Sequence, residues 1–421
     1  MSQSDIIARE RATRIGLEST FGTTPSGIFP NAMTRCFPLG DDLILEGLAE
    51  EMLPVGDERV RRLDAIHPVH GLRMASKIGA LKTLLKATPS ANQLTAAGTP
   101  MESGAYIILK HALGADHAEL GSTVASAASA TAFTVASGEG VNFGKGCFIA
   151  VAVSGEMEWT QITNISTDTL TVSPALSTTP SASAVVRNLY NFVPAESHSS
   201  SLAIDQTFVG DSTAQVTANG CYGDISFDMP EFGKLPSMSL SLTATNFTGP
   251  SSQGLTATTA SDPEGAAFAW SPKVYLAASV SRGTSLVCEG AGVEFANGWE
   301  VVRDPGATQT VHSVVNAGGR PVAVKANIKL RFDSAYPAAF SADTAYRLII
   351  VQKIGTGATA SFWIWSLPAA RLVAQPKLTK IGSRLHMELM LEGTPSTLIT
   401  DAGETGLAAD FIHSPFFVAF G

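Results

Sequence analysis

The chain has little charge for its length. Of its 421 residues, 15% are charged, whereas an ordinary globular chain has about 25%. Apolar residues make up 45% of the chain, and much of the remainder is Gly, Ser, Thr and Ala. Two explanations stay open at this point: a fold rich in strands and loops, or a surface that is largely covered by further copies of the same chain.

Basic residues are scarcer than acidic ones. The chain has 28 Lys and Arg against 37 Asp and Glu, a formal net charge of −9. A protein that grips nucleic acid needs clustered Lys and Arg, so this balance argues against that class. The densest basic stretch, ERVRRLD at 58–64, is flanked by its own acids. It is more typical of a solvated or subunit-contacting loop than of a phosphate site.

The sequence also lacks paired cysteines and long apolar segments. Its four cysteines are scattered, with no C-x-x-C pair and no histidine at ligand spacing, which predicts reduced structural thiols: Cys36, Cys147, Cys221 and Cys288. The N-terminal stretch MSQSDIIARERATRIGLE has no apolar segment of the kind that a signal peptide needs, and no apolar run approaches the length of a membrane-spanning helix. We therefore expect a chain made in a cytoplasm, without a membrane partner.

One glycine-rich loop, GEGVNFGKG at 138–146, invites a phosphate-binding interpretation. A Walker A loop needs glycine at the position that Glu139 occupies, and a dinucleotide fingerprint needs a helix after the loop. The stretch that follows, CFIAVAV, is strand-like. A turn between two strands is the better interpretation.

Catalytic and metal-binding patterns are weak elsewhere. His67 and His70 flank Pro68, which excludes a regular helix, so we expect a loop with two histidines rather than a metal site. Glu156 and Glu158 would share one face of a strand, which is commonplace on exposed strands. The sequence therefore predicts no catalytic constellation, no cofactor and no metal, and a protein that is not an enzyme.

The clearest positive pattern is an alternation of polar and apolar residues over 223–242. Because side chains alternate between the two faces of a strand, it predicts a β-hairpin with one buried face. The buried face would carry Ile225, Phe227, Met229, Met238, Leu240 and Leu242. The other face carries hydroxyls and acids in place of the Lys and Glu usual on a strand that faces water: Asp224, Ser226, Asp228, Ser237, Ser239, Ser241 and Thr243.

A helix is predicted to begin at Thr99-Pro100-Met101-Glu102. Thr as N-cap, Pro at the first helical position and Glu at the third form a capping box, and Gly114 is a natural end. The apolar stripe of this helix comprises Met101, Ala105, Ile108, Leu109, Ala112 and Leu113.

The order of elements is repeated along the chain. Strand, long loop, alternating strand, helix and hairpin come in this order before residue 250 and again after it, with an Ala/Ser/Thr-rich stretch of short strands inserted in the first copy. We therefore predict a mainly β chain that is a tandem duplication with a small inserted all-β module. The predicted domains are 1–117 with 188–250, the inserted module 118–187, and 251–421.

This order, with a hairpin of the type GCYGDISFDMPEFGKLPSMSLSLTATNF (220–247), resembles the major tail tube proteins of long-tailed bacteriophages. The resemblance covers 1–117 and 188–250, and again 251–421. It implies β-sandwich or barrel tube domains, each with a flanking helix, that form homo-trimeric rings if the domain is duplicated and hexameric rings otherwise. The rings would stack around a channel through which DNA passes without specific binding.

The resemblance also implies roles for particular residues. The apolar hairpin face would pack on the helix, and the Ser/Thr/Asp face would line the lumen, although Lys325, Lys329 and Arg331 lie on the polar face of a strand expected in the same sheet. Loops at about 49–70 and 296–320 would stack one ring on the next through Asp57, Glu58, Arg59, Arg61, Arg62, Asp64, Arg303 and Asp304. The C-terminal segment is too apolar to fray, so we expect burial in the sheet or in a subunit contact for Phe411, Ile412, Phe416, Phe417 and Phe420.

Partners and location follow from the resemblance alone. It implies tape-measure, tail-terminator and tail-tip proteins as partners, assembly in a bacterial cytoplasm, and a final place in the virion tail. Three alternatives stay open: another virion or secretion-tube assembly protein, such as a capsid-decorating β-sandwich or a fibre; a binding module in which 118–187 recognises a carbohydrate with Trp159 as the stacking residue; and an enzyme whose site residues are dispersed along the sequence. The insert departs from the plainest members of the family and would be displayed at the surface.

Overall fold

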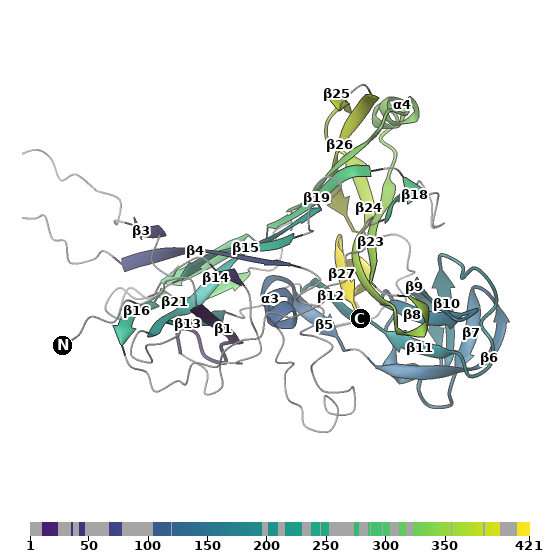
Figure 1. Ribbon diagram of the computed structural model, residues 1–421, viewed down its shortest axis with the longest axis horizontal. Coiled ribbons are helices and arrows are strands. Elements are labelled where there is room, and N and C mark those ends of the chain that lie inside the picture. The colour runs from purple at the N-terminus through teal and green to yellow at the C-terminus, as the bar shows by residue number, and fades with distance from the viewer. Residues whose placement is uncertain are drawn as a thin grey trace, which may run out of the picture.

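The structure is a computed structural model (Figure 1). It describes residues 11–23, 35–36, 42–46, 67–77, 104–118, 120–195, 201–208, 215–229, 237–244, 246–251, 273–277, 285–286, 288–296, 298–303, 311–316, 323–354, 356–381, 384–395 and 411–421.

The described chain is mainly β, as predicted, and its strands pair antiparallel. Nineteen strands form one hydrogen-bonded network, six close into a barrel, and two form a separate ribbon. The elements before the barrel are β1 (Arg11–Leu17), β2 (Arg35–Cys36), β3 (Asp42–Glu46), β4 (His67–Lys77), the helix α3 (Gly104–Leu113) and β5 (Gly114–His117). Those between the barrel and residue 251 are β12 (Tyr190–Pro194), β13 (Leu202–Phe208), β14 (Gln215–Met229), β15 (Ser237–Ala244) and β16 (Asn246–Ser251).

The remaining elements follow residue 251 and include the helix α4. They are β17 (Lys273–Ala277), β18 (Ser285–Leu286), β19 (Cys288–Ala296), β20 (Trp299–Arg303), β21 (Val311–Asn316), β22 (Ala323–Arg331), α4 (Ala335–Ser341), β23 (Tyr346–Ile354), η3 (Gly357–Thr359), β24 (Ser361–Leu372), β25 (Lys377–Ile381), β26 (Arg384–Thr394) and β27 (Phe417–Phe420).

The predicted hairpin over 223–242 is confirmed. β14 and β15 pair in register from Tyr222 opposite Thr243 to Asp228 opposite Ser237. Ile225 and Phe227 are buried on its apolar face. The sequence predicted that this face meets the helix. Both side chains do share a buried cluster with α3, but the ring of Phe227 stacks on Trp365 of β24, 4.1 Å between centroids.

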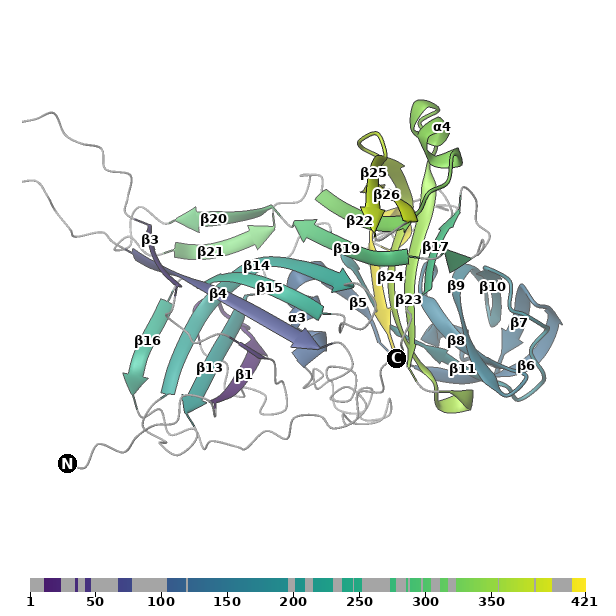
Figure 2. The same cartoon turned by 45° about the horizontal axis from the view of Figure 1, so that its top comes forward.

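The hairpin continues into strands from beyond residue 251. β14 pairs with β19, from Ile225 opposite Phe295 to Met229 opposite Ala291. β19 pairs with β22, and β22 pairs with β26. One sheet therefore runs through β3, β4, β15, β14, β19, β22, β26 and β25, and Figure 2 shows β4, β15 and β14 side by side at its first end.

The helix α3 packs under the first part of this network. Ile107, Ile108 and Leu109 are buried, as is the turn of Ala112 and Leu113, and α3 contacts β1, β5, β12 and β14. Four members of the predicted apolar stripe, Ile108, Leu109, Ala112 and Leu113, are thus buried. Met101 lies outside the described residues. The predicted N-cap, Thr99, lies outside the described residues.

The six-stranded barrel lies between Gly121 and Asn188, and the module predicted from the sequence spans 118–187. Its strands close in the order β10–β7–β6–β11–β8–β9. They are β6 (Gly121–Ser129), β7 (Ala132–Val135), β8 (Phe148–Val153), β9 (Glu156–Ser166), β10 (Thr169–Ser173) and β11 (Val185–Asn188), with a short 3-10 helix η2 (Gly140–Asn142). Alternate side chains fill the interior, among them Val124, Phe133, Ile149, Leu170 and Val186.

The barrel does not stand away from the chain as a displayed module. The outward side chains of Phe148 and Trp159 are buried in a second cluster with Tyr275, Phe362 and Phe417 from the network after residue 251. Trp159 lies 5.7 Å from Tyr275 between ring centroids. One wall of the barrel is therefore core, and Figure 1 shows the barrel against β23 at one end of the molecule.

The last strand joins the two parts of the chain. β27 lies between β24 and β12, with Phe420 opposite Trp363 on one side and Tyr190 on the other. The predicted C-terminal residues Phe411, Ile412, Phe416, Phe417 and Phe420 are all at most 2% exposed within the single chain. This burial needs no contact with a second copy.

Two loop predictions are wrong. His67 and His70 were expected in a loop, but both lie in β4. Arg303 was expected in a stacking loop at 296–320, but it ends β20, which pairs with β21 inside that stretch. Trp299 of β20 donates to the Gly223 carbonyl at 2.8 Å and stacks on His111 of α3, so this ribbon is held against the first part of the chain.

A buried carboxylate anchors β1. Glu18 accepts hydrogen bonds from the backbone N–H groups of Gly22 and Gly220, each at 2.8 Å, and from the Ser201 hydroxyl at 2.6 Å. Gly220 has φ +60°, a left-handed conformation that suits glycine. Burial raises the pKa of the Glu18 carboxyl above its usual 4.5, although these hydrogen bonds oppose the shift.

We predict that replacing Phe420 by Ala lowers the free energy of unfolding by about 3–5 kcal/mol, because its ring packs on Tyr190, Phe192 and Trp363. Denaturant unfolding measures the change. The control is V141A, at a side chain that is 83% exposed, which we expect to change stability by less than about 0.5 kcal/mol. Equal stability of the two variants would contradict the central place of β27.

A second prediction concerns pH. Because the folded-state pKa of Glu18 is raised, the folded chain binds more protons than the unfolded chain at pH values between 4.5 and the raised value. Glu18 therefore makes stability fall as pH rises through that window, and E18Q should remove this component of the slope. Unfolding curves collected across that range test it, with E139Q as a control that keeps the slope of the unaltered chain.

Candidate functional site

The candidate site is one side of the continuous sheet. Residues directly opposite one another in antiparallel strands lie on the same side of a sheet, so the registers define rows of residues. The longest row crosses eight strands and comprises Arg35, Ala75, Ser239, Ser226, Glu294, Lys325, Glu392 and Arg371.

Three shorter rows run beside it on the same side. They are Arg73 with Ser241 and Asp224; Lys77 with Ser237 and Asp228; and Lys329 with Glu388 and Lys377. We call the side that carries these four rows the polar sheet face. Six of the seven hairpin residues predicted from the sequence to share one polar side belong to these rows, and the seventh, Thr243, pairs with Gly71 and lies on the same side.

Exposure separates this face from its reverse side. Asp224, Glu294 and Lys325 are exposed, whereas the alternating residues Ile225, Phe295 and Val324 are at most 2% exposed. The strands after residue 251 thus continue the hydroxyl-rich side of the hairpin as a side that carries charged residues. The sequence pattern missed this join because a register between strands that lie far apart in the chain leaves no local signal.

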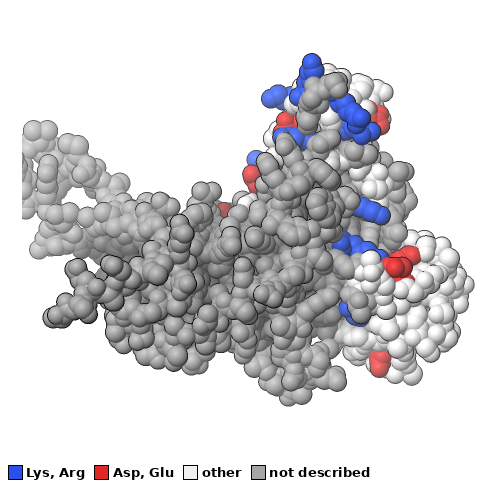
Figure 3. Space-filling model, in the orientation of Figure 1, with Lys and Arg blue, Asp and Glu red and all other residues white. Residues whose placement is uncertain are grey.

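The end of the sheet near β25 is basic and partly apolar. Figure 3 shows Lys and Arg side chains gathered where β25, β26 and α4 lie. Lys377, Lys380 and Arg384 are exposed there, beside three exposed apolar side chains: Phe332 (46%), Leu378 (55%) and Leu385 (48%). We call this group the basic tip. Among the described residues, β25 is hydrogen-bonded to β26 alone, so its other edge has no strand partner there.

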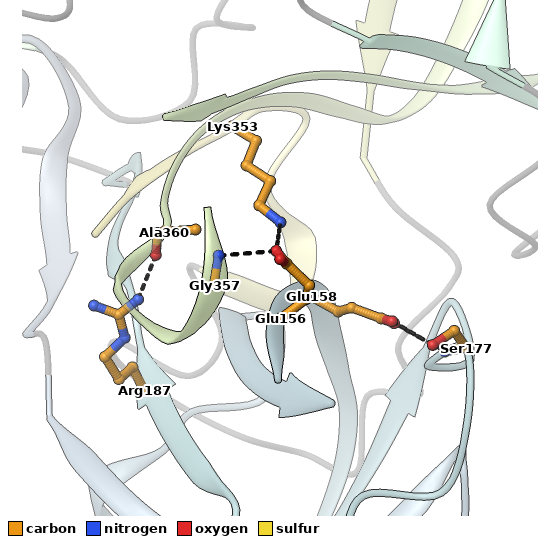
Figure 4. A network of polar contacts seen from close by, with 7 residues as sticks. All are labelled: Glu156, Glu158, Ser177, Arg187, Lys353, Gly357 and Ala360. Carbon is orange, nitrogen blue, oxygen red and sulfur yellow. Dashed lines mark hydrogen bonds and ion pairs between the residues drawn. The ribbon is translucent and has the colours of Figure 1, made fainter. Parts of the chain in front are cut away.

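A second polar group joins the barrel to the sheet (Figure 4). Glu156, at the start of β9, accepts from Lys353 Nζ at 2.7 Å and from the Gly357 N–H at 3.0 Å. These contacts lower the pKa of the Glu156 carboxyl, the Lys353 bond most. Arg187 of β11 donates to the Ala360 carbonyl at 2.6 Å. The η3 turn is therefore held from two barrel strands.

A buried arginine strengthens this junction. Arg347 of β23 donates to the Gln161 side-chain oxygen of β9 at 2.5 Å, and burial lowers the pKa of its guanidinium to about 10. At the barrel entrance, the Asn191 amide donates to and accepts from the Phe148 backbone, at 3.0 and 2.6 Å, as a strand partner would. These contacts hold the two parts together, so the junction is a structural joint.

The glycine-rich loop 138–146 has its amides occupied. Asp168 accepts from the N–H groups of Gly138 and Gly140, at 3.0 and 2.9 Å, and these bonds lower the pKa of its carboxyl. A phosphate cradle would need such amides for its ligand. The loop is thus a turn between barrel strands, as the sequence analysis favoured.

The other chemical candidates from the sequence do not converge. Glu158 points away from Glu156 and bonds to the Ser177 backbone N–H at 2.8 Å and to its hydroxyl (Figure 4). Trp159 is 5% exposed, too buried to stack on a carbohydrate. Within the described ranges, no group of three His, Cys, Asp or Glu could hold a metal ion, and no helix is long and apolar enough to cross a membrane.

Most of the residues predicted to stack rings fall outside the described part of the chain: Asp57, Glu58, Arg59, Arg61, Arg62, Asp64 and Asp304.

No family model matches the chain, and no curated protein matches it in sequence.

We predict that G140A destabilises the barrel by about 2–3 kcal/mol, because a Cβ at this position would lie 1.9 Å from the Thr167 carbonyl oxygen. The matched control is G121A, whose Cβ would meet its nearest atom, the Val186 carbonyl oxygen, at 3.8 Å. Thermal unfolding followed by near-ultraviolet circular dichroism compares the two. A G140A variant as stable as G121A would contradict the described loop.

Proposed function

We propose that the chain is a structural subunit of a phage tail tube. Copies of it would form rings by continuing the sheet from one chain into the next, and the rings would stack around a channel lined by the polar sheet face. DNA would pass along this face without specific binding. This proposal includes assembly in a bacterial cytoplasm and a place in the virion tail with tape-measure, terminator and tail-tip partners.

The observation that carries the proposal is the pairing of β14 with β19. It joins two sets of four strands that have the same order. The first set, β3, β4, β14 and β15 in chain order, lies across the sheet in the order β3, β4, β15, β14. The second set, β19, β22, β25 and β26 in chain order, lies in the order β19, β22, β26, β25. In both sets the last two strands of the chain exchange places. Each set also has a helix after its second strand. This order supports a duplicated tube domain and rings of three chains.

If the β14–β19 junction is repeated between copies, the two open ends of the sheet meet. One end is the outer edge of β25, and the other is formed by β2 and β3, which pair only with β4 in the described chain. Unpaired strand edges of this kind readily add further strands, and ring closure removes them.

Exposed apolar area supports the same contact. Leu378 and Leu385 are 55% and 48% exposed at the β25 end and would be covered there. A second copy of this chain is therefore a suitable neighbour for the tip by its apolar area.

The rival functions have less support. A carbohydrate-binding barrel loses its candidate stacking residue, since Trp159 is core. Another assembly protein built from the same sheet would share the edges but not a channel, so its assemblies would lack a continuous lumen.

Negative-stain electron microscopy of the concentrated, purified chain tests the proposal. We expect hollow rings or tubes with a central channel and threefold symmetry of the chain. Solid fibres or sheets would favour another assembly protein, and six chains in a ring would contradict the duplication.

Cross-linking tests the junction between copies. Lys377 and Lys77 lie on strands six steps apart in the sheet, about 29 Å at 4.8 Å per step. With a short amine-reactive reagent, we expect a Lys377–Lys77 cross-link in the ring fraction and none in the monomer fraction. Mixing of isotopically labelled and unlabelled chains shows whether it joins two copies; a cross-link confined to one copy would contradict the contact.

A further inference from the structure

The basic residues of the polar sheet face conflict with a channel for DNA. Lys325 and Lys329 lie on the same side of the sheet as Asp224 and Ser226. A row of free Lys and Arg on this side would collect phosphates and release their counterions, so that DNA would be held rather than passed.

The registers place an acid beside these basic residues. Lys325 of β22 lies opposite Glu294 of β19 on one side and Glu392 of β26 on the other. Glu392 in turn lies opposite Arg371, which forms an ion pair with Asp343. The charges along this row alternate in sign across four neighbouring strands.

In the neighbouring row the charges also alternate in sign, but there an acid lies between two lysines. Glu388 of β26 lies opposite Lys329 of β22 and opposite Lys377 of β25. At the hairpin end, Asp224 and Asp228 stand one serine away from Arg73 and Lys77 in their rows. The pattern thus recurs in separate rows built from different strands.

We propose that Glu294, Glu392 and Glu388 act as cross-strand counterions that keep Lys325 and Lys329 from binding DNA phosphates. This inference rests on the proposed function, because it takes the polar sheet face as the surface that DNA passes. Opposite charges directly across a strand pair attract one another. A carboxylate on the neighbouring strand also repels a phosphate that approaches the lysine. The wall then stays hydrated and charged, and both Lys325 and Lys329 have an acid directly across the strand.

The counterion role separates this face from the basic tip. At the tip, Lys380 lies opposite Leu385 in the β25–β26 register, without an acid across the strand. Lys325 and Lys329 thus have acids directly across the strand, whereas Lys380, opposite Leu385, and Arg331, opposite His386, do not.

The test measures DNA affinity of the dispersed chain by fluorescence anisotropy with a short labelled duplex at low salt. We expect weak binding by the unaltered chain. The double variant E294Q/E392Q should bind at least about tenfold more tightly, with a dependence of log Kd on log salt steeper by about one to two. Adding K325Q to the double variant should return both values toward those of the unaltered chain.

The matched control is E139Q/E158Q, which changes the net charge equally but on the barrel. Its affinity should stay within about twofold of the unaltered chain, because a charge far from the row is screened beyond about 10 Å. Equal affinity of the two double variants, or no effect of K325Q, would overturn the inference. Circular dichroism of each variant shows that these substitutions leave the fold intact.

This experiment does not depend on assembly, so the two hypotheses can fail separately. If the unaltered chain forms no hollow assembly while E294Q/E392Q gains DNA affinity over its control, the proposed function is contradicted and the charge balance stands. If tubes form and the two double variants bind DNA equally, the tube stands and the counterion role is overturned.

Discussion

The architecture depends on the hydrogen bonds between β14 and β19. They convert a hairpin from before residue 251 and a sheet from after it into one surface with a buried and a polar side. Without this pairing, β14 beyond Gly223 would have a single partner in the described chain, β15, and the buried Phe295 and Phe227 would have no common core. The two sets of four strands would then be separate sheets.

Packing on the buried side explains why the pairing holds. Phe227 stacks on Trp365, Phe295 stacks on Phe416, and the C-terminal strand closes the same cluster around Phe420. The barrel adds a second layer, because Phe148 and Trp159 cover the outer side of β23, β24 and β27. The buried Arg347–Gln161 hydrogen bond also joins the barrel to the sheet.

The sequence allowed prediction of what is local and periodic. The hairpin over 223–242, the helix up to Leu113 and the strands around Phe148 follow from alternation or from helical spacing. It did not reveal the contacts between distant elements: Phe227 on Trp365, or Lys325 between Glu294 and Glu392. The loop predicted at 296–320 was wrong because β20 and β21 are short, and they are stabilised by pairing with each other and by the hydrogen bond of Trp299 to Gly223.

In the proposed tube, the open edges of the sheet become paired when copies assemble. Hydrogen–deuterium exchange of the monomeric and assembled chain tests it directly. The account predicts that amides of β25 and β3 gain protection on assembly, whereas those of β14 and β19, already paired within the chain, are protected in both states. Unchanged exchange of β25 and β3 in an assembled tube would contradict the account.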